Sequence, residues 1–324
     1  MTSRQRSGRH APTISGWRRA ARRTAAAVCA LVLLGCVGLG TQAAVAARHP
    51  ASAVYATAHA SAVDPGGKQP HVVWLLVLGS DARPGQDIRR ERADAIHLVG
   101  VNSVTGAGIS IGIPRDSYVA IPGSGRNKIN SAMAYGGPSL MARTVAEFTG
   151  IEPDYVVLTG FAGFKHIVNG FGGLDIDVPV GVHSGGADVD SGHQHLDGED
   201  ALWYGRARHG VPGGDLGRSD HQGLILIAML AQLKKHSSAP ASMASALSIL
   251  LSGLSVKMSP AEAYRLYQVG MAAEPAKIKN CVLPGGFGWA GSQSIVVPDL
   301  NVLHHIVADV RDDATLSGAC PRAY

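Results

Sequence analysis

Charged residues stand at the ends of apolar segments in the first half of the chain. Asp81 directly follows one such segment, and Asp94 precedes the next. Two carboxylates that share a site repel each other unless a cation lies between them. A hard divalent ion with oxygen ligands meets this need, and Mg²⁺ suits it best when the substrate carries phosphates. The sequence therefore predicts Asp81 and Asp94 as Mg²⁺ ligands.

Arginines are concentrated in the stretch YGRARHGVPGGDLGRSDHQ, which spans residues 204–222 around a glycine-rich turn. Guanidinium groups bind phosphate through two parallel hydrogen bonds, so a ring of them beside Mg²⁺ would form a pyrophosphate clamp. Such a clamp neutralises the charge that grows on a leaving group. Taken singly, an arginine beside an aspartate is as readily a surface ion pair worth ~0–1 kcal/mol. The predicted pyrophosphate ligands are Arg83, Arg92, Arg115, Lys128, Asn130, Arg206, Arg208, Arg218 and Gln222.

The predicted chemistry is attack of a hydroxyl group on phosphorus, and a side chain must accept the hydroxyl proton. Asp81 and Asp116 are both candidates, and the sequence does not choose between them. Arg115 precedes Asp116 and is predicted to take part in catalysis with them. Ser80 is not predicted as a nucleophile because no GxSxG motif surrounds it. The absence of P-loop and GxGxxG motifs also gives no support to a nucleotide-binding fold.

The elements that position these residues alternate between strands and helices, which predicts one main α/β domain. Continuous apolar runs such as residues 71–80 fit strands that are buried on both faces. We expect a three-layer α/β/α arrangement with a central mixed sheet, preceded by one N-terminal transmembrane helix. Residues 181–195 are predicted to form a variable loop, and the segment after 278 a strand and a Gly-rich loop. The expected helices are 130–150 (two pieces split by Gly-Gly-Pro), 163–173, one that starts within 196–209, 219–235, 239–253, 259–272 and 298–310.

The N-terminal segment has the charge pattern of a membrane anchor. Residues 1–24 contain seven arginines and no acidic residue, which predicts a cytoplasmic tail. Residues 25–47 carry no charge and would reach ~35 Å as a helix, enough to cross a bilayer core. An uncleaved signal anchor is the preferred interpretation. Cleavage at the A-x-A-like Ala44-Val45-Ala46 and lipid attachment at Cys36 stay open as alternatives.

The rest of the chain is predicted to lie outside the cell membrane, with a linker over residues 48–70 and a catalytic domain over 71–324. A hydrophobic content of 46% and a charged content of 16% indicate a folded protein. Removing the seven tail arginines from the 29 basic residues leaves 22 against 24 acidic residues, a net charge of −2. This near-neutral domain argues against binding to nucleic acid, which would place positive charge on the folded domain.

Two cysteines, Cys281 and Cys320, belong to this domain. In an oxidising compartment they are expected to form a disulfide. Closing a loop of this length is worth ~3–4 kcal/mol in the chain-entropy model. Two separate buried thiols are the alternative, and a zinc site would need more ligands nearby.

The motifs together resemble the LytR-CpsA-Psr family of cell-envelope proteins. They run in order from residue 73 to residue 235, about half of the chain, and residues 1–47 match the family's cytoplasmic tail and single spanning helix. Residues 240–324 carry no motif that supports the resemblance. The matching stretches are LVLGSDARPGQ, RADAIHLVGVN, ISIGIPRDSYV, NKINSAMAYGG, TVAEFTGIEPDYVVLTGFAGFKHIVNGFGGLDIDV, LDGEDALWYGRARH and GDLGRSDHQ.

The resemblance implies an extracytoplasmic transferase. It would move a glycopolymer from a polyprenyl-pyrophosphate carrier to peptidoglycan and form a phosphodiester link. Asp81 and Asp94 match the family's Mg²⁺-holding aspartates. Its pyrophosphate ligands are matched by Arg92, Arg115, Arg206, Arg208 and Arg218, together with Lys128 and Gln222. The polyprenyl tail would lie in an apolar pocket. Its expected walls are the helices of 131–170 and the residues Leu224, Ile227, Ala228 and Leu230.

Two other functions remain open at this point. The same site could hydrolyse the pyrophosphate of a lipid carrier. Alternatively, the protein could be a non-catalytic envelope-binding or regulatory protein, since some relatives carry the label of transcriptional regulator. An anchored external domain of near-neutral charge makes contact with DNA a poor fit.

Overall fold

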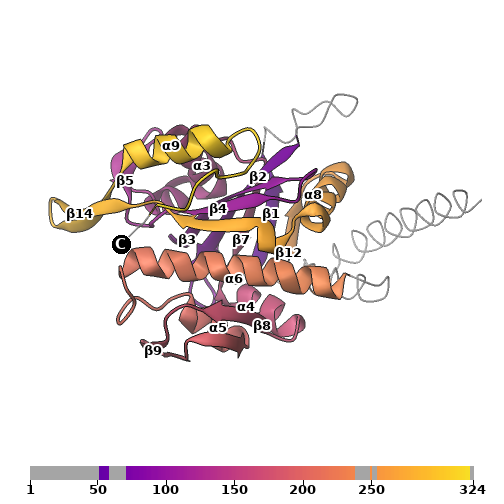
Figure 1. The fold of residues 1–324 in the computed structure, drawn as a ribbon. Helices are drawn as coiled ribbons and strands as arrows, with labels where there is room; N and C mark the ends of the chain where they lie inside the picture. Colours follow the sequence, from indigo (N-terminus) through magenta and orange to yellow (C-terminus); the bar gives the residue numbers. More distant parts are fainter. Residues whose placement is uncertain (1–50, 58–70, 238–248, 250–253, 322–324) are drawn as a thin grey trace, which may run out of the picture.

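The fold is seen in a computed structural model that describes residues 51–57, 71–237, 249 and 254–321. Its centre is a mixed seven-stranded sheet, in which three pairs of neighbouring strands are parallel and three are antiparallel (Figure 1). The predicted central mixed sheet is therefore confirmed. In spatial order the strands are β12 (Leu254–Lys257), β1 (Ser52–Ala56), β7 (Tyr155–Thr159), β2 (Val72–Ser80), β3 (Ala93–Asn102), β4 (Gly108–Gly112) and β13 (Ile278–Val282).

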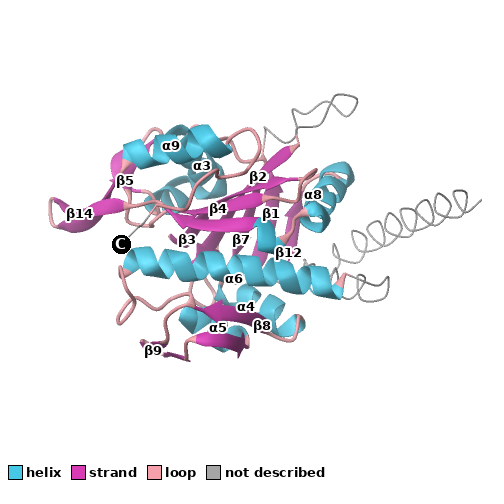
Figure 2. Cartoon of the chain, viewed as in Figure 1, coloured by secondary structure: helices cyan, strands magenta, loops and turns pink. Residues whose placement is uncertain are grey.

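Helices cover both faces of the sheet (Figures 1 and 2). On one face lie α3 (Ser131–Thr149) and α9 (Leu300–Val310). On the other lie α6 (Asp215–His236) and α8 (Pro260–Ala272). Beyond α6, a second cluster is built from the smaller elements of residues 161–204. These are α4 (Phe161–Gly170), β8 (Leu174–Val178), β9 (Val182–Ser184), β10 (Ala187–Val189), β11 (Gly192–Leu196) and α5 (Gly198–Tyr204).

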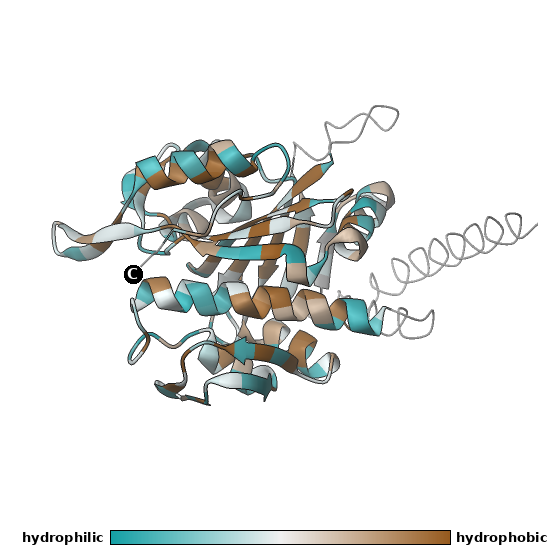
Figure 3. Ribbon diagram, in the orientation of Figure 1, coloured by the Kyte–Doolittle hydropathy of each residue, from teal (hydrophilic) through white to brown (hydrophobic). Residues whose placement is uncertain are grey.

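The alternation of side chains along β2 explains its unbroken apolar sequence. Leu76 and Leu78 pack in the cluster with α3 and α9, whereas Val73 and Leu75 pack in the cluster with α8. Successive side chains of a strand point to opposite faces, so a strand covered on both sides is apolar at every position. Figure 3 shows this as hydrophobic colour along the central strands.

Helix α3 is interrupted where the sequence predicted a split. Gly137 adopts φ 67° and ψ −162°, outside the helical region, and Pro138 follows it. Gly150 ends the helix in the left-handed conformation, as is usual for glycine after a last helical turn.

Predictions about irregular segments were wrong in several places. Residues 52–56, assigned to the linker, form β1, which lies between β12 and β7 in the sheet. This Ala- and Ser-rich strand is too short to show a pattern, and it is held by pairing on both sides. Residues 181–195 contain β9, β10 and most of β11 instead of a loop. Their glycines made these short ribbons hard to distinguish from a loop.

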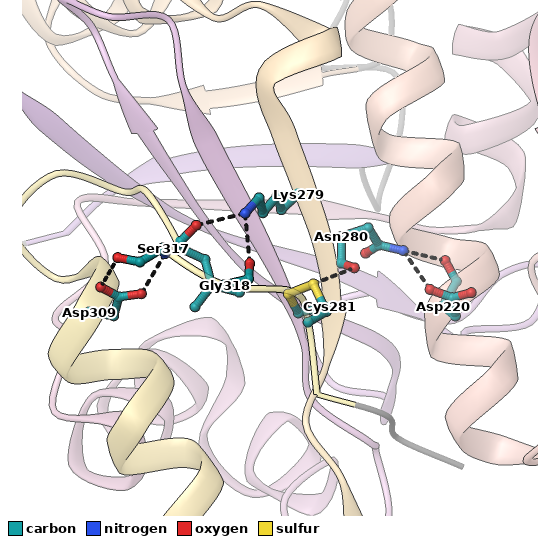
Figure 4. Close-up of a disulfide and its surroundings, with 9 residues drawn as sticks. Asp220, Lys279, Asn280, Cys281, Asp309, Ser317 and Gly318 are labelled. Atoms are coloured by element: carbon teal, nitrogen blue, oxygen red, sulfur yellow. Dashed lines mark hydrogen bonds between the residues drawn. A yellow bond between two sulfur atoms is a disulfide. The ribbon is translucent and has the colours of Figure 1, made fainter.

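The C-terminal part adds a β-hairpin and a disulfide. The Gly-rich segment after β13 is the hairpin of β14 (Gly285–Ala290) and β15 (Gln293–Pro298), where a loop was predicted. A second hairpin, β5 (Tyr118–Ile121) and β6 (Gly125–Lys128), follows β4. The predicted bond between Cys281 and Cys320 is present, with the Cα atoms 5.3 Å apart (Figure 4).

The predicted anchor lies outside the described residues, as does nearly all of the helix expected at 239–253. Among the residues that the structure does describe, no helix is both long and apolar enough to span a bilayer.

Candidate active site

The topology of the sheet brings the predicted residues to one edge. Strands β2, β4, β7 and β13 run in one direction, and β3 runs in the opposite one. Asp81 follows the end of β2, Asp94 stands near the start of β3, and Arg115 follows the end of β4. The Asp81 N–H donates to the Arg92 carbonyl at 3.1 Å, which closes the turn between β2 and β3. The carboxyl ends of β2, β4, β7 and β13 therefore lie together, and ligands bind at such strand ends in open α/β sheets. We call this end of the sheet the site edge.

Arg115 joins two carboxylates at the site edge. Its Nη1 lies 2.5 Å from Oδ1 of Asp94, and its Nε lies 3.7 Å from Oδ2 of Asp215. Asp215 also lies 3.3 Å from Nη2 of Arg218 and 3.9 Å from Nη1 of Arg208. Three guanidinium groups therefore surround two aspartates, which leaves an excess of one positive charge. We call Arg115, Arg208, Arg218, Asp94 and Asp215 the arginine cluster.

Arg218 is the most deeply buried member of this cluster, with 6% of its side chain exposed. Burial lowers the pKa of its guanidinium, and the negative charge of Asp215 acts in the opposite direction. Its Nε has no hydrogen-bond partner among the described residues. A buried donor without a partner is costly, and an anionic ligand could satisfy it.

The start of α6 places this arginine. Gly214 precedes the helix at φ 57°, a conformation that favours glycine, and Asp215 is the first helical residue. A Cβ on Gly217 would lie 2.1 Å from the Pro212 carbonyl oxygen, so the first turn packs directly against the glycine-rich turn. Arg218 is then one turn from a helix N-terminus, where backbone N–H groups and the helix dipole favour anions.

Asp81 stands in negative surroundings. Burial raises the pKa of its carboxyl group, and the charges of Asp94 and Glu91 raise it further, while Arg115 and Arg83 act against them. Mutual repulsion of this kind is relieved by a cation between the two carboxylates. No group of three metal-ligating side chains exists within the described parts of the chain. The two carboxylates fit Mg²⁺, which commonly takes one or two carboxylates and fills its other positions with water and substrate phosphates.

The other predicted side chains differ in the contacts that they make with the arginine cluster. Asp116 pairs with Lys128 at 3.0 Å. The Gln222 amide donates to the Gly205 carbonyl at 2.9 Å and faces the Asp94 carbonyl at 3.4 Å. Asn130 is buried and reaches the cluster through its backbone, because its N–H donates to the Arg115 carbonyl at 3.2 Å.

Arg83 and Arg92 are exposed in the β2–β3 turn. No hydrogen bond or ion pair ties either side chain to the cluster in the described ranges. Their inclusion among the pyrophosphate ligands therefore stays a prediction.

Arg206 is held over aromatic rings instead of a carboxylate. Its guanidinium carbon lies 4.6 Å from the centre of the Phe161 ring and 4.9 Å from that of Trp203. Stacking of this kind orients a guanidinium without neutralising its charge.

An apolar cavity of about 100 Å³ opens beside Arg206. It lies between β2 and β3 on one side and α4, α5 and α6 on the other. Its lining includes three polar residues of the site, which are Asp94, Arg206 and Gln222. Of the helices predicted to wall the lipid pocket, α4 lines this cavity, whereas α3 lies on the opposite face of the sheet. The α6 wall is formed by Ile225 and Leu226. The four predicted residues are absent from it: Leu224 and Ala228 pack into the cluster beyond α6, Leu230 packs toward α8, and Ile227 is not a lining residue.

Four residues of the site were not predicted from the sequence. Asp215 was not among the predicted ligands, yet it is the centre of the cluster. Phe161 and Trp203 gave no signal, since an aromatic residue in a helix is core by default. His97 lines the cavity, and burial lowers its pKa to about 4, so it is neutral at physiological pH.

Comparisons with known proteins identify relatives of this chain. The LytR_cpsA_psr family matches residues 40–306. The polyisoprenyl-teichoic acid–peptidoglycan teichoic acid transferase TagT of Bacillus subtilis (strain 168) is 37% identical over 177 residues, 52% of this chain and 54% of that protein. The chain spans about half the length of the curated relatives it matches.

Solved structures share the fold over a larger part of the chain. The crystal structure of B. subtilis TagV gives a TM-score of 0.65 at 26% identity and covers 76% of this chain and 98% of that one. The LytR-CPS2A-psr family protein YwtF (TagT), solved with bound octaprenyl pyrophosphate lipid, gives a TM-score of 0.59 at 26% identity and covers 78% and 92%.

Proposed function

The chain belongs to the LytR-CpsA-Psr family, and from this membership and the site we propose that it transfers a glycopolymer from a polyprenyl-pyrophosphate carrier to a sugar hydroxyl of peptidoglycan. The observation that carries the proposal is the apolar cavity that opens beside an excess of guanidinium groups. A ligand that fits both parts has a long apolar tail joined to a strongly anionic group. A polyprenyl pyrophosphate has this composition, and one relative was solved with such a lipid bound.

The chain's own side chains account for binding. Arg115, Arg208 and Arg218 would hold the pyrophosphate oxygens, with Arg206 closing the mouth of the cavity. The prenyl tail would lie along β2, β3 and α6. Asp81 and Asp94 would hold Mg²⁺, which would supply further neutralisation of the negative charge of the pyrophosphate.

The proposed reaction is one displacement at phosphorus. The acceptor hydroxyl oxygen bonds to the phosphorus nearest the glycan, and the bond from that phosphorus to the bridging oxygen breaks. Polyprenyl phosphate leaves with the electron pair, and the glycan is left in a phosphodiester link. The arginines stabilise the negative charge that grows on the departing phosphate, which is the main task of a phosphoryl-transfer site.

Two carboxylates can take the hydroxyl proton. Asp81 is one of them, and burial and the charges of neighbouring acids raise the pKa of its carboxyl group. Asp116 is held by Lys128 next to Arg115. The variants Asp81→Asn and Asp116→Asn separate their roles. Loss of the base lowers the rate at every Mg²⁺ concentration, whereas loss of a metal ligand raises the Mg²⁺ needed for half-maximal activity.

The proposed location is the cell membrane, with the N-terminus in the cytoplasm, a single crossing at residues 25–47 and the catalytic domain outside. The disulfide between Cys281 and Cys320 supports this proposal, because such bonds persist in oxidising compartments.

The test incubates the purified full-length protein in detergent with a polyprenyl-pyrophosphate-linked glycan, Mg²⁺ and a peptidoglycan fragment. The expected product is the glycan–peptidoglycan conjugate together with polyprenyl phosphate. Release of free glycan at the same rate with and without acceptor would instead assign the site to a hydrolase. No turnover of the lipid under any condition would contradict both enzymatic assignments and favour a binding protein.

A further inference from the structure

The β14–β15 hairpin carries the most exposed aromatic side chains of the described residues. Trp289 is 74% exposed and Phe287 is 69% exposed. They stand two residues apart on β14 and therefore point to the same face of the ribbon. Exposure of large aromatic side chains to water is unfavourable, and an exposed patch of them commonly marks an interaction surface.

The topology fixes this hairpin beside the candidate active site. β13 runs parallel to β4, so both strands end at the site edge. Arg115 follows the end of β4, and β14 begins three residues after the end of β13. The Val296 N–H of β15 donates to the Asp116 carbonyl at 2.9 Å, and Ser117 pairs with Val296. Figure 1 shows the hairpin projecting beyond the end of the sheet at which α6 begins.

The chemistry of the hairpin limits what can bind there. Residues 283–298 contain no charged side chain, and residues 280–310 contain neither Lys nor Arg. Anionic lipid surfaces attract clusters of basic residues, which this segment lacks. Four glycines (Gly285, Gly286, Gly288 and Gly291) leave the ribbon with little side-chain bulk around the two rings. A flat, uncharged ligand can therefore approach both rings and the adjacent backbone.

We infer that the hairpin is the docking platform for the acceptor, on which the pyranose rings of a glycan strand stack against Trp289 and Phe287. The apolar C–H face of a sugar ring matches an indole face, while its hydroxyl groups stay in water or meet backbone groups of the ribbon. A strand held there runs past Asp116 and can place a hydroxyl at the site edge. This inference rests on the proposed transfer to peptidoglycan and adds where the acceptor is held.

The kinetic test uses the full-length protein with Trp289→Ala and the double variant Phe287→Ala/Trp289→Ala. We expect KM for the acceptor to rise about tenfold or more, as for aromatic residues that dominate an interface. The KM for the lipid-linked donor and kcat at saturating acceptor should stay within about twofold. Val104→Ala is the matched control, because Val104 is 69% exposed on the β3–β4 turn at the opposite edge of the sheet. Acceptor KM unchanged in the double variant would overturn the inference.

A binding test works even if the protein proves to have no transferase activity. Purified peptidoglycan sacculi are sedimented with the wild type and with Trp289→Ala, and the bound fraction is compared. Loss of sedimentation in the variant supports the platform. Equal sedimentation of the two proteins overturns it. Two further measurements can reveal another role for the hairpin in a variant that binds sacculi normally: a lower dimer fraction than the wild type, or less tryptophan quenching in vesicles that contain brominated lipids. Those last two results assign the hairpin to a second copy or to the membrane.

Discussion

The arginine cluster and the β8–β11 ribbon both bring basic and acidic side chains together, but they do so differently. In the ribbon each histidine faces one aspartate on the opposite strand. His195 lies 2.7 Å from Asp175, and His193 lies 2.9 Å from Asp177. These side chains are 41–90% exposed. In the arginine cluster Arg218 and Asp215 are only 6% and 13% exposed, and cations outnumber anions.

The difference separates a surface pair from a binding site. Exposed partners of this kind are already satisfied by each other, by neighbours such as Lys235 beside Asp175, and by water, so they offer little to a ligand. A partly buried excess of charge is unfavourable until an anion arrives, and the energy of that mismatch becomes available for binding. The four predictions below test whether the two regions differ as much as this contrast requires.

The largest effect is expected at the buried guanidinium. Arg218→Ala should lower transferase activity about 10²- to 10³-fold, because it removes a donor to the charge that grows on the leaving phosphate. Arg218→Lys should recover only part of it, since an ammonium lacks the two-pronged geometry. Initial rates of conjugate formation give the measurement, and thermal unfolding checks the fold. Arg143→Ala, on an exposed position of α3, is the control. A folded Arg218→Ala protein with near-normal activity would remove the cluster from the mechanism.

The second effect concerns the paired carboxylates. Asp94→Asn should raise the Mg²⁺ concentration for half-maximal activity by about tenfold or more, as loss of a metal-site interaction does. Because the pKa of Asp81 is raised, protons should compete with Mg²⁺ at this group as the pH falls. The half-maximal Mg²⁺ concentration should therefore increase toward acidic pH in the wild type. Identical Mg²⁺ curves at all pH values and in Asp94→Asn would contradict metal binding here.

The third effect is confined to the lipid tail. Leu226→Trp places an indole in the cavity and should raise KM for a long-chain donor about tenfold, the equivalent of about 1.4 kcal/mol of lost binding. A donor with a short prenyl chain serves as the comparison, and its KM should change little. Equal changes for both donors would show that the cavity does not hold the tail.

The smallest effect is expected in the ribbon. The pKa of His195 is raised, first by its hydrogen bond to Asp175, and the pKa of Asp175 is lowered by the same bond. The stabilisation from His195 is complete below its ordinary pKa and is lost as the pH rises through the raised one. That from Asp175 is present above its ordinary pKa and is lost as the pH falls through the lowered one. The pair therefore contributes most between about pH 4 and about pH 6.5.

His195→Asn should accordingly cost at most about 0.5 kcal/mol near pH 5.5, as for an exposed pair, and almost nothing at pH 9. Urea unfolding at the two pH values measures it, and transferase activity should not change. A loss of activity comparable to that of Arg218→Ala would erase the contrast between the two regions.

The sequence allowed much of the site to be predicted because strand ends are local features. Apolar runs ending in Asp81 and Arg115 identify strands and their termini, and the short turn between β3 and β4 fixes their relative direction. The role of Asp215 could not be predicted, because it depends on how α6 packs against the sheet. The residues of α6 that face the cavity could not be identified for a related reason. Two different clusters bury the helix, so the positions of its apolar residues do not show which of them face the cavity.

The C-terminal tail has a consequence for how the molecule behaves at high concentration. β13 is the last strand of the sheet, and such a strand offers unpaired backbone groups to other chains. The tail lies beside it: Lys279 donates to the carbonyls of Leu316 and Gly318, both at 2.7 Å, and Cys320 is bonded to Cys281 (Figure 4). Reduction of this bond would remove the covalent hold on the tail, which would then depend on the packing of Leu316 and on the hydrogen bonds of Lys279 and Ser317. We therefore expect the disulfide to protect this strand from edge-to-edge association as well as to crosslink the chain.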